Sequence, residues 1–149
     1  MVETNGRNFD LLTLGQVLLR LSPPDNERLS RGDTFVKQVG GAELNVAVGA
    51  ALLGLHTGVI SKLPAHDIGS FMKGKIRSFG VSDDFFMYDQ SPAARVGIYY
   101  YENGAYPRKP KVIYDRNHSS FFSLDIDEIP EEVYTASKCF HTTGITLAL

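Results

Sequence analysis

The sequence predicts an α/β fold with a parallel sheet, and three observations support that prediction. Short apolar runs of strand length, such as residues 9–14 and 57–63, end at a glycine or a proline. Longer segments, residues 43–53 and 68–79, carry apolar side chains at helical spacing. The two kinds of segment alternate along the chain, which is typical of parallel strands joined by helical crossovers.

The first third of the chain predicts three strands and a helix. Residues 9–14 read FDLLTL and stop at a glycine, as a buried strand followed by a turn does. A second apolar run over residues 17–21 ends before two prolines, and residues 34–39 alternate like a strand with one exposed face. The helix predicted over residues 43–53 is followed by Gly54 at the usual position of a carboxyl-terminal cap.

The middle of the chain predicts a strand, a helix and another strand. Residues 57–63 form an apolar run that Pro64 ends. Asp67 can cap a helix whose apolar positions continue to Phe79. Residues 81–87 then predict one further strand.

The last third differs in character. Residues 96–101 and 111–114 are aromatic and β-rich and are joined by a Gly/Pro loop, so they predict a hairpin added to the α/β core. Residues 127–136 are weakly helical, and residues 138–144 predict a strand that ends in a glycine turn. Because no covering helix follows that strand, position 149 does not resemble a natural domain end.

Composition indicates one compact domain and excludes several classes of protein. The 149 residues include 15 basic and 17 acidic side chains, a formal net charge of -2, without the basic stripe of a nucleic-acid-binding protein. No apolar run approaches the roughly 20 residues of a membrane span, and Met1 to Asn8 lack the features of a signal peptide. The single cysteine, Cys139, suits a reducing compartment. We therefore expect a cytoplasmic protein with no nucleic-acid or membrane partner.

The strongest candidate site is the junction between the strand at 34–39 and the following helix, which reads Gly40-Gly41-Ala42-Glu43-Leu44-Asn45. Glycines allow a ligand to approach the backbone closely. The first N–H groups of a helix attract sugar oxygens or a carboxylate, and Asn45 offers both a donor and an acceptor. A plain glycine turn before a helix explains the same residues, so the pattern alone leaves both readings open.

Several segments, in order from Phe9 to the last residue, resemble the pfkB family of ribokinase-type carbohydrate kinases. Residues 40–54 (GGAELNVAVGAALLG) resemble the first family signature, and residues 14–24 resemble the opening strands. Three further segments resemble the 2-keto-3-deoxygluconate kinase branch, namely residues 96–99, 112–116 and 140–145.

The resemblance implies the fold and the site. It implies the N-terminal part of a ribokinase-like, Rossmann-like α/β/α core over residues 9–149, with a small β lid formed by residues 17–21, 34–39, 96–101 and 111–114. It also implies that the sugar acid is held by Gly41, Tyr99, Tyr114 and Arg116, in addition to Gly40 and Asn45 of the junction. Chemistry agrees, since an arginine can bind a carboxylate through a bidentate fork that a neutral hexose does not need.

The resemblance further implies ATP and Mg²⁺ as cofactors of the complete enzyme and a possible homodimer through the lid. Two departures from the family pattern stand out. Gln16 takes the place where many relatives carry Glu, which removes a charge near the sugar. The second signature, a Gly-Ala-Gly-Asp-like turn that carries the catalytic base, does not occur in these residues. We therefore expect this chain to lack the ATP-binding half and, by itself, to be inactive.

Other readings of the sequence remain. A fructokinase-like enzyme for another sugar and a non-catalytic association or sugar-binding module are the alternatives. A dinucleotide-binding domain is not indicated, since no G-x-G-x-x-G follows the first strand. Residues 69–75 match part of a phosphate-binding P-loop but lie within a predicted helix. Cys139 and His141 are predicted to be a buried thiol and a hydrogen-bonded histidine, not a metal site.

Overall fold

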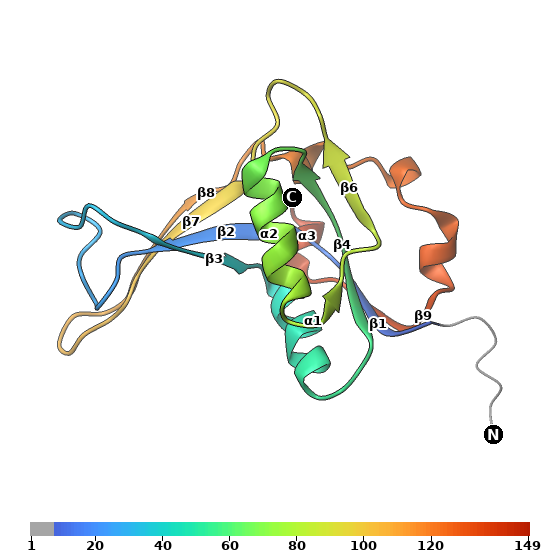
Figure 1. Cartoon of the computed structure of the whole chain (residues 1–149), viewed down its shortest axis with the longest axis horizontal. Coiled ribbons are helices and arrows are strands. Elements are labelled where there is room, and N and C mark those ends of the chain that lie inside the picture. The colour runs from blue at the N-terminus through green and yellow to red at the C-terminus, as the bar shows by residue number, and fades with distance from the viewer. Residues whose placement is uncertain (1–7) are drawn as a thin grey trace.

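The computed structural model describes residues 8–149. From the sequence, no signal peptide is expected over Met1 to Asn8, and all of that segment except Asn8 lies outside the described residues. Two sheets make up the fold, which we call the core sheet and the small sheet (Figure 1). The core sheet consists of β1 (Phe9–Leu14), β4 (Thr57–Pro64), β5 (Val81–Ser82), β6 (Phe86–Asp89) and β9 (Ser137–His141). The small sheet consists of β2 (Leu18–Ser22), β3 (Val36–Gly40), β7 (Gly97–Glu102) and β8 (Lys111–Asp115).

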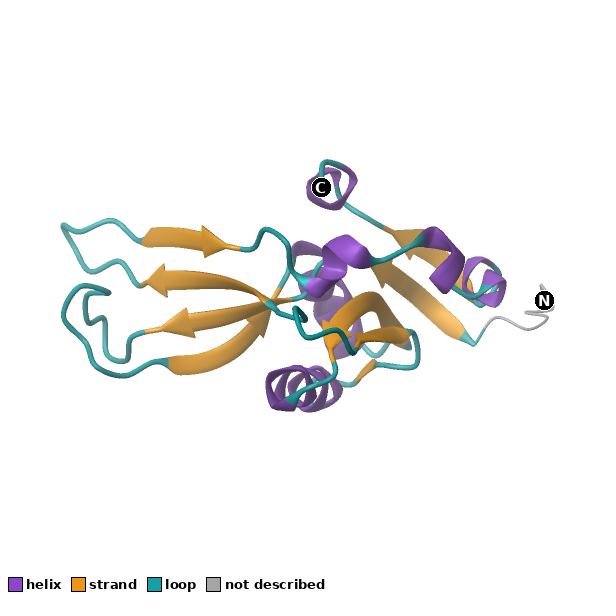
Figure 2. Cartoon of the chain, turned by 90° about the horizontal axis from the view of Figure 1, so that it is seen from above, coloured by secondary structure: helices purple, strands orange, loops and turns teal. Residues whose placement is uncertain are grey.

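The helical elements are few and short. They are α1 (Ala42–Leu52), α2 (Asp67–Arg77), α3 (Gly144–Leu147) and the 3₁₀ helices η1 (Ser120–Ser123), η2 (Ile126–Glu128) and η3 (Glu131–Tyr134). Helices α1 and α2 lie on one face of the core sheet, and the 3₁₀ helices lie on the other (Figures 1 and 2). The predicted α/β fold is thus confirmed, with a helix-covered face and a second face covered by 3₁₀ turns.

All pairings in the core sheet are parallel. The strand order is β5-β4-β1-β9, and β6 continues along the same edge of β4 that β5 begins. This is the arrangement that strand–helix–strand crossovers produce. Both β1 and β4 are buried on both faces, which explains why their sequences are continuous apolar runs rather than alternating ones.

Two apolar clusters sandwich the core sheet. On the helix side, Leu44 of α1 and Met72 and Ile76 of α2 pack around Val59. On the other side, Phe9, Leu12 and Ile60 pack against Ile129 and Val133 of the 3₁₀ segment. The neighbours Val59 and Ile60 point to opposite clusters, as the two-residue period of a strand requires.

The small sheet projects from one end of the core (Figure 2). Its order is β3-β2-β7-β8, with β2 and β7 parallel and both outer pairs antiparallel. The observed strands begin or end within two residues of the ranges 17–21, 34–39, 96–101 and 111–114 that the sequence analysis gave.

Several local predictions were wrong. Residues 81–87 form two strands, because Asp84 N–H bonds to Ser82 Oγ and the chain turns there between β5 and β6. The cap of α2 is His66, whose Nδ1 accepts from the amide of Ile68, and not Asp67. Residues 127–136 contain 3₁₀ turns in place of an α-helix.

The carboxyl-terminal segment also differs from the prediction. A short helix, α3, starts at Gly144, where a glycine turn was expected. Cys139, predicted to be buried, is exposed, because no described element covers that face of β9. His141 Nε2 is buried without a hydrogen-bond partner among the described residues, contrary to the expected satisfied histidine.

The P-loop-like residues 69–75 lie inside α2, as predicted. A Cβ at Gly69 would come within 2.0 Å of the Pro64 carbonyl oxygen, so this glycine serves helix packing. Among the described residues, no helix has the length and apolar character needed to cross a membrane.

Candidate functional site

A pocket of about 470 Å³ opens where the small sheet meets the start of α1. Its walls come from the inner face of the small sheet, the first turn of α1 and the segment after β9. The lining residues are Gln16, Leu18, Arg20, Gly41, Ala42, Glu43, Asn45, Tyr99, Tyr101, Val112, Tyr114, Arg116 and Ile145. The structure therefore brings together five of the six residues that the sequence analysis named, and Gly40 is the exception.

Gly41 joins β3 to α1 and cannot be replaced without strain. Its φ of 142° is a conformation that L side chains rarely adopt, and an added Cβ would lie 2.7 Å from the Gln16 carbonyl oxygen. The Asn45 amide bonds back to the Gly41 carbonyl at 2.9 Å and closes the first helical turn. The Asn45 side chain is exposed and faces the pocket opening.

Tyr99 and Tyr114 are opposite each other on β7 and β8, with their ring centroids 5.9 Å apart. Tyr99 is half-buried, and burial raises the pKa of its phenol. A Cβ at Gly40 would lie 2.4 Å from the Tyr99 hydroxyl oxygen. Gly40 thus leaves room for this hydroxyl group and does not itself line the pocket.

Arg116 directly follows β8, and its charge is not compensated by any carboxylate of the described residues. Its Nε is buried without a hydrogen-bond partner, and its Cζ lies 6.0 Å from the centroid of the Tyr114 ring. Among residues 8–149, no carboxylate lies within 4.0 Å of its guanidinium. A partly buried, unpaired guanidinium in a pocket favours an anionic ligand.

Gln16 fixes the backbone of Arg116. Its Nε2 donates to the Arg116 carbonyl oxygen at 3.2 Å and to Ser119 Oγ at 2.6 Å. Gly97 makes this approach possible, because a Cβ there would lie 2.9 Å from Gln16 Nε2 and 3.3 Å from Arg116 Cβ. The bond to the Arg116 carbonyl needs a donor, which an amide supplies and a carboxylate does not, whereas the Ser119 hydroxyl can pair with either group.

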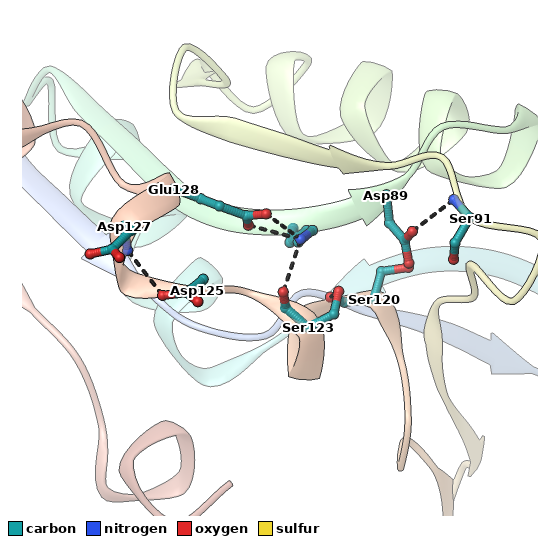
Figure 3. A network of polar contacts seen from close by, with 8 residues as sticks. Asp89, Ser91, Ser120, Ser123, Asp125, Asp127 and Glu128 are labelled. Atoms are coloured by element: carbon teal, nitrogen blue, oxygen red, sulfur yellow. Dashed lines mark hydrogen bonds and ion pairs between the residues drawn. The ribbon is translucent and has the colours of Figure 1, made fainter.

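A polar network anchors the segment that follows Arg116 to the core sheet (Figure 3). Ser120 Oγ donates to Asp89 at 2.8 Å, and the same carboxylate accepts from the Ser91 amide. Further along, Lys62 Nζ donates to the Ser123 carbonyl and to the Glu128 carboxylate. The base of β8, and with it Arg116, is held by these contacts on one side and by Gln16 on the other.

Glu43 is a buried carboxylate that the sequence analysis did not single out. Its Oε1 accepts from the Thr143 amide at 3.1 Å and from the hydroxyls of Thr143 and Thr146, each at 2.6 Å. Burial raises the pKa of this carboxyl, but the hydrogen bonds outweigh burial, so the net pKa is lowered. Glu43 therefore holds the segment carrying Ile145 against the pocket as a charged group.

Arg20 and Tyr101 were also missed. Arg20 lies opposite Tyr99 in the parallel pair of β2 and β7, so both side chains share one face of the small sheet. The two-residue period through Leu18, Arg20 and Ser22 is the signal that could have identified it. Arg20 Cζ lies 4.3 Å from the centroid of the Tyr101 ring.

The pocket holds two arginines and one glutamate, and the glutamate is engaged by threonines. Its electrostatic character is therefore cationic. Within the described part of the chain, no group of three His, Cys, Asp or Glu side chains is placed to hold a metal ion. The arrangement can bind an anion, stack on sugar carbons through tyrosine rings and hydrogen-bond hydroxyl groups.

The chain matches a family model described as pfkB family carbohydrate kinase over residues 8–149. It is 37% identical over 140 residues to a 2-dehydro-3-deoxygalactonokinase from Haloferax volcanii, a match covering 94% of this chain and 43% of that protein. It is 30% identical to 5-dehydro-2-deoxygluconokinase 1 from Bacillus cereus, covering 99% of this chain and 44% of the relative.

A solved structure of 2-dehydro-3-deoxygluconokinase from Thermotoga maritima has the same arrangement. The TM-score is 0.87 at 38% identity, over 93% of this chain and 42% of that one. This chain thus spans less than half the length of the relatives it matches.

Proposed function

Because the chain belongs to the pfkB family of carbohydrate kinases, we propose that it supplies the sugar-binding part of an ATP-dependent sugar-acid kinase. The proposed reaction transfers the γ-phosphoryl group of ATP to the 6-hydroxyl of 2-keto-3-deoxygluconate. The names of the similar proteins support a deoxy sugar acid as the substrate class. The sugar acids in these names differ in configuration and in the position of the keto group. The choice of 2-keto-3-deoxygluconate among them is therefore part of the proposal.

The unpaired guanidinium of Arg116 is the main observation that supports a sugar acid as the substrate class. A ligand carboxylate would occupy the place left by the missing protein counter-ion and accept two parallel hydrogen bonds from the guanidinium. Hydrogen bonds of this charged kind contribute about 1.5–3 kcal/mol each. A neutral sugar would leave the arginine unpaired at a comparable cost.

The other residues would orient the ligand. Tyr99 and Tyr114 would provide an aromatic wall with hydroxyl donors, and the absence of a side chain at Gly41 would let the sugar approach the first N–H groups of α1. Asn45 would hydrogen-bond a hydroxyl group. The small sheet, which supplies most of these side chains, would act as the lid.

ATP and Mg²⁺ belong to the proposal for the complete enzyme, and we assign no residue of this chain to either. Phosphoryl transfer requires a base and groups that stabilise charge on the phosphoryl oxygens. We therefore expect the 149-residue chain to bind the sugar acid weakly and to turn over nothing by itself. Formation of ADP from ATP and the sugar acid by the purified chain would contradict this expectation.

The test is calorimetric titration of 2-keto-3-deoxygluconate into the chain, after circular dichroism has shown that it is folded. Fructose and ATP serve as comparison ligands. Saturable heat with the sugar acid and none with fructose would support the proposal. Equal or tighter binding of fructose would favour a fructokinase-like pocket and sink the sugar-acid assignment.

A second candidate function is association. Val36 and Ile113 of the small sheet and Phe35, which directly precedes β3, are between 42% and 47% exposed, an uncovered apolar surface that a second copy would bury in a homodimer. Light scattering with and without the sugar acid separates the two ideas. Sugar-independent dimers from a chain that binds no sugar would favour an association module.

A further inference from the structure

The second arginine of the pocket, Arg20, is placed like a ligand-binding group. It lies in the middle of β2, on the face of the small sheet that also carries Tyr99 and Tyr114. Its positive charge acts on Tyr99, where it opposes the rise in pKa that burial causes. Arg20 therefore lies beside the surface on which a sugar would rest.

The Arg20 guanidinium is oriented before any ligand binds. One of its faces stacks on the Tyr101 ring, with Cζ 4.3 Å from the ring centroid. Its Nε donates to Ser22 Oγ at 2.9 Å. These two contacts leave the two Nη groups without a partner in the described residues, in the fork geometry that matches an oxyanion.

No carboxylate in the part of the chain that the structure describes neutralises this arginine. Among residues 8–149, neither Arg20 nor Arg116 has a carboxylate within 4.0 Å. The only carboxylate in the pocket lining belongs to Glu43, which accepts from Thr143 and Thr146. Two unpaired guanidiniums in one pocket repel each other unless an anion joins them.

The two arginines lie on opposite sides of Tyr99. Arg20 is on β2 and Arg116 follows β8, with β7 between them. Two strand spacings amount to roughly 10 Å across the sheet. Two arginine side chains and an extended six-carbon sugar acid can bridge that span.

We propose that Arg20 binds a second oxyanion group, so that the pocket prefers six-carbon sugar acids that are charged at both ends. The second group would be a carboxylate or a phosphate, at the end of the carbon chain opposite the carboxylate that Arg116 binds. The inference rests on the proposed function only in placing a sugar acid in this pocket. If that sugar acid is phosphorylated at its 6-hydroxyl, the second oxyanion is the one that phosphorylation creates.

The test compares three ligands that share a six-carbon chain. Gluconate carries one anionic end, glucarate carries a second carboxylate, and 6-phosphogluconate carries a phosphate. Each is titrated into the folded chain and into two variants, Arg20→Gln and, as a matched control on α2, Arg77→Gln. We expect the unaltered chain and the control to bind at least one doubly charged ligand about 10-fold or more tightly than gluconate.

The Arg20→Gln variant should lose the preference for the doubly charged ligands, and its affinity for gluconate should fall much less than its affinity for them. A Ser22→Ala variant, which frees the guanidinium but keeps its charge, should retain part of the preference. Which of glucarate and 6-phosphogluconate binds more tightly identifies the second group as carboxylate or phosphate.

The inference is overturned if the unaltered chain binds all three ligands equally, if it binds none of them, or if Arg20→Gln retains the preference. A failure of the proposed function would give a different result from a failure of this inference. Binding of these ligands with no binding of 2-keto-3-deoxygluconate would refute the substrate assignment and leave the role of Arg20 intact.

Discussion

The core sheet and the small sheet are built from similar strands but place their polar groups differently. In the core sheet, β1 and β4 are buried on both faces, and the apolar clusters contain no charged side chain. In the small sheet, one face carries Arg20, Tyr99 and Tyr114, and β8 is exposed along its whole length. Because of this difference, we expect substitutions in the core sheet to affect mainly stability and substitutions on the pocket face of the small sheet to affect mainly ligand binding.

The largest effect should come from the core. Leu12 of β1 is fully buried in the cluster that packs against the 3₁₀ segment. Leu12→Ala should therefore lower the free energy of unfolding by about 2–5 kcal/mol through lost contacts and a cavity. Val112→Ala on the small sheet, at 42% exposure, should cost no more than about 0.5 kcal/mol. Urea unfolding measures both. Equal losses would remove the distinction between the two sheets.

For Arg116 we expect a large effect on ligand affinity and a small effect on stability. Arg116→Gln should weaken binding of 2-keto-3-deoxygluconate by about 10- to 100-fold, because the charged hydrogen bonds to the carboxylate are lost. The free energy of unfolding should change by less than about 0.5 kcal/mol. Calorimetry and urea unfolding test the two halves of this prediction. Arg77→Gln, on the exposed face of α2, should alter neither quantity, and an equal loss of affinity there would point to a general charge effect.

A smaller effect is expected for Gln16→Glu. A carboxylate would face the Arg116 carbonyl oxygen instead of donating to it, and it would add a negative charge to the pocket wall. We expect the affinity for the sugar acid to fall about 10-fold while the affinity for neutral sugars is unchanged. Gln90→Glu, an exposed position, is the control. Unchanged affinity for the acid in Gln16→Glu would show that the pocket charge does not select the ligand.

The smallest effect concerns Glu43 and depends on pH. The threonine hydrogen bonds lower the pKa of this carboxyl, so its ionised form stabilises the fold above its usual pKa of about 4.5. That contribution is lost as the pH falls through the lowered pKa. Glu43→Gln should therefore cost about 1 kcal/mol near neutral pH and progressively less below pH 4.5. Glu131→Gln, on an exposed 3₁₀ turn, should show no such pH dependence in urea unfolding. A Glu43→Gln difference that stays constant with pH would contradict the assignment.

The sequence predicted the elements whose patterns are local. The apolar runs of β1 and β4 and the helical spacing of α1 and α2 are each visible within a dozen residues. The Gly40-Gly41 junction was visible for the same reason, since a positive φ before a helix is a local requirement. The resemblance to the family supplied Tyr99, Tyr114 and Arg116, which periodicity alone does not distinguish from ordinary strand residues.

The remaining features depend on partners far away in the sequence. Glu43 becomes recognisable only when Thr143 and Thr146 are seen next to it, and Gln16 only next to Ser119. The break between β5 and β6 follows from a turn at two aspartates that a propensity window reads as part of one strand. Cys139 was expected to be buried because cysteines usually are, but burial of β9 depends on what covers it.

The parallel pairing of β2 with β7 has a consequence for the order in which the molecule can assemble. These neighbours are separated in sequence by β3, α1, β4, α2, β5 and β6, so a large loop must close before their ladder forms. The intervening segment can build much of the α/β core by itself, through the contacts of β4 with α1, β6 and α2. During synthesis, the half of the pocket made by β2 and the start of α1 would therefore wait for β7 and β8, and the pocket would be among the last parts of the chain to acquire its shape.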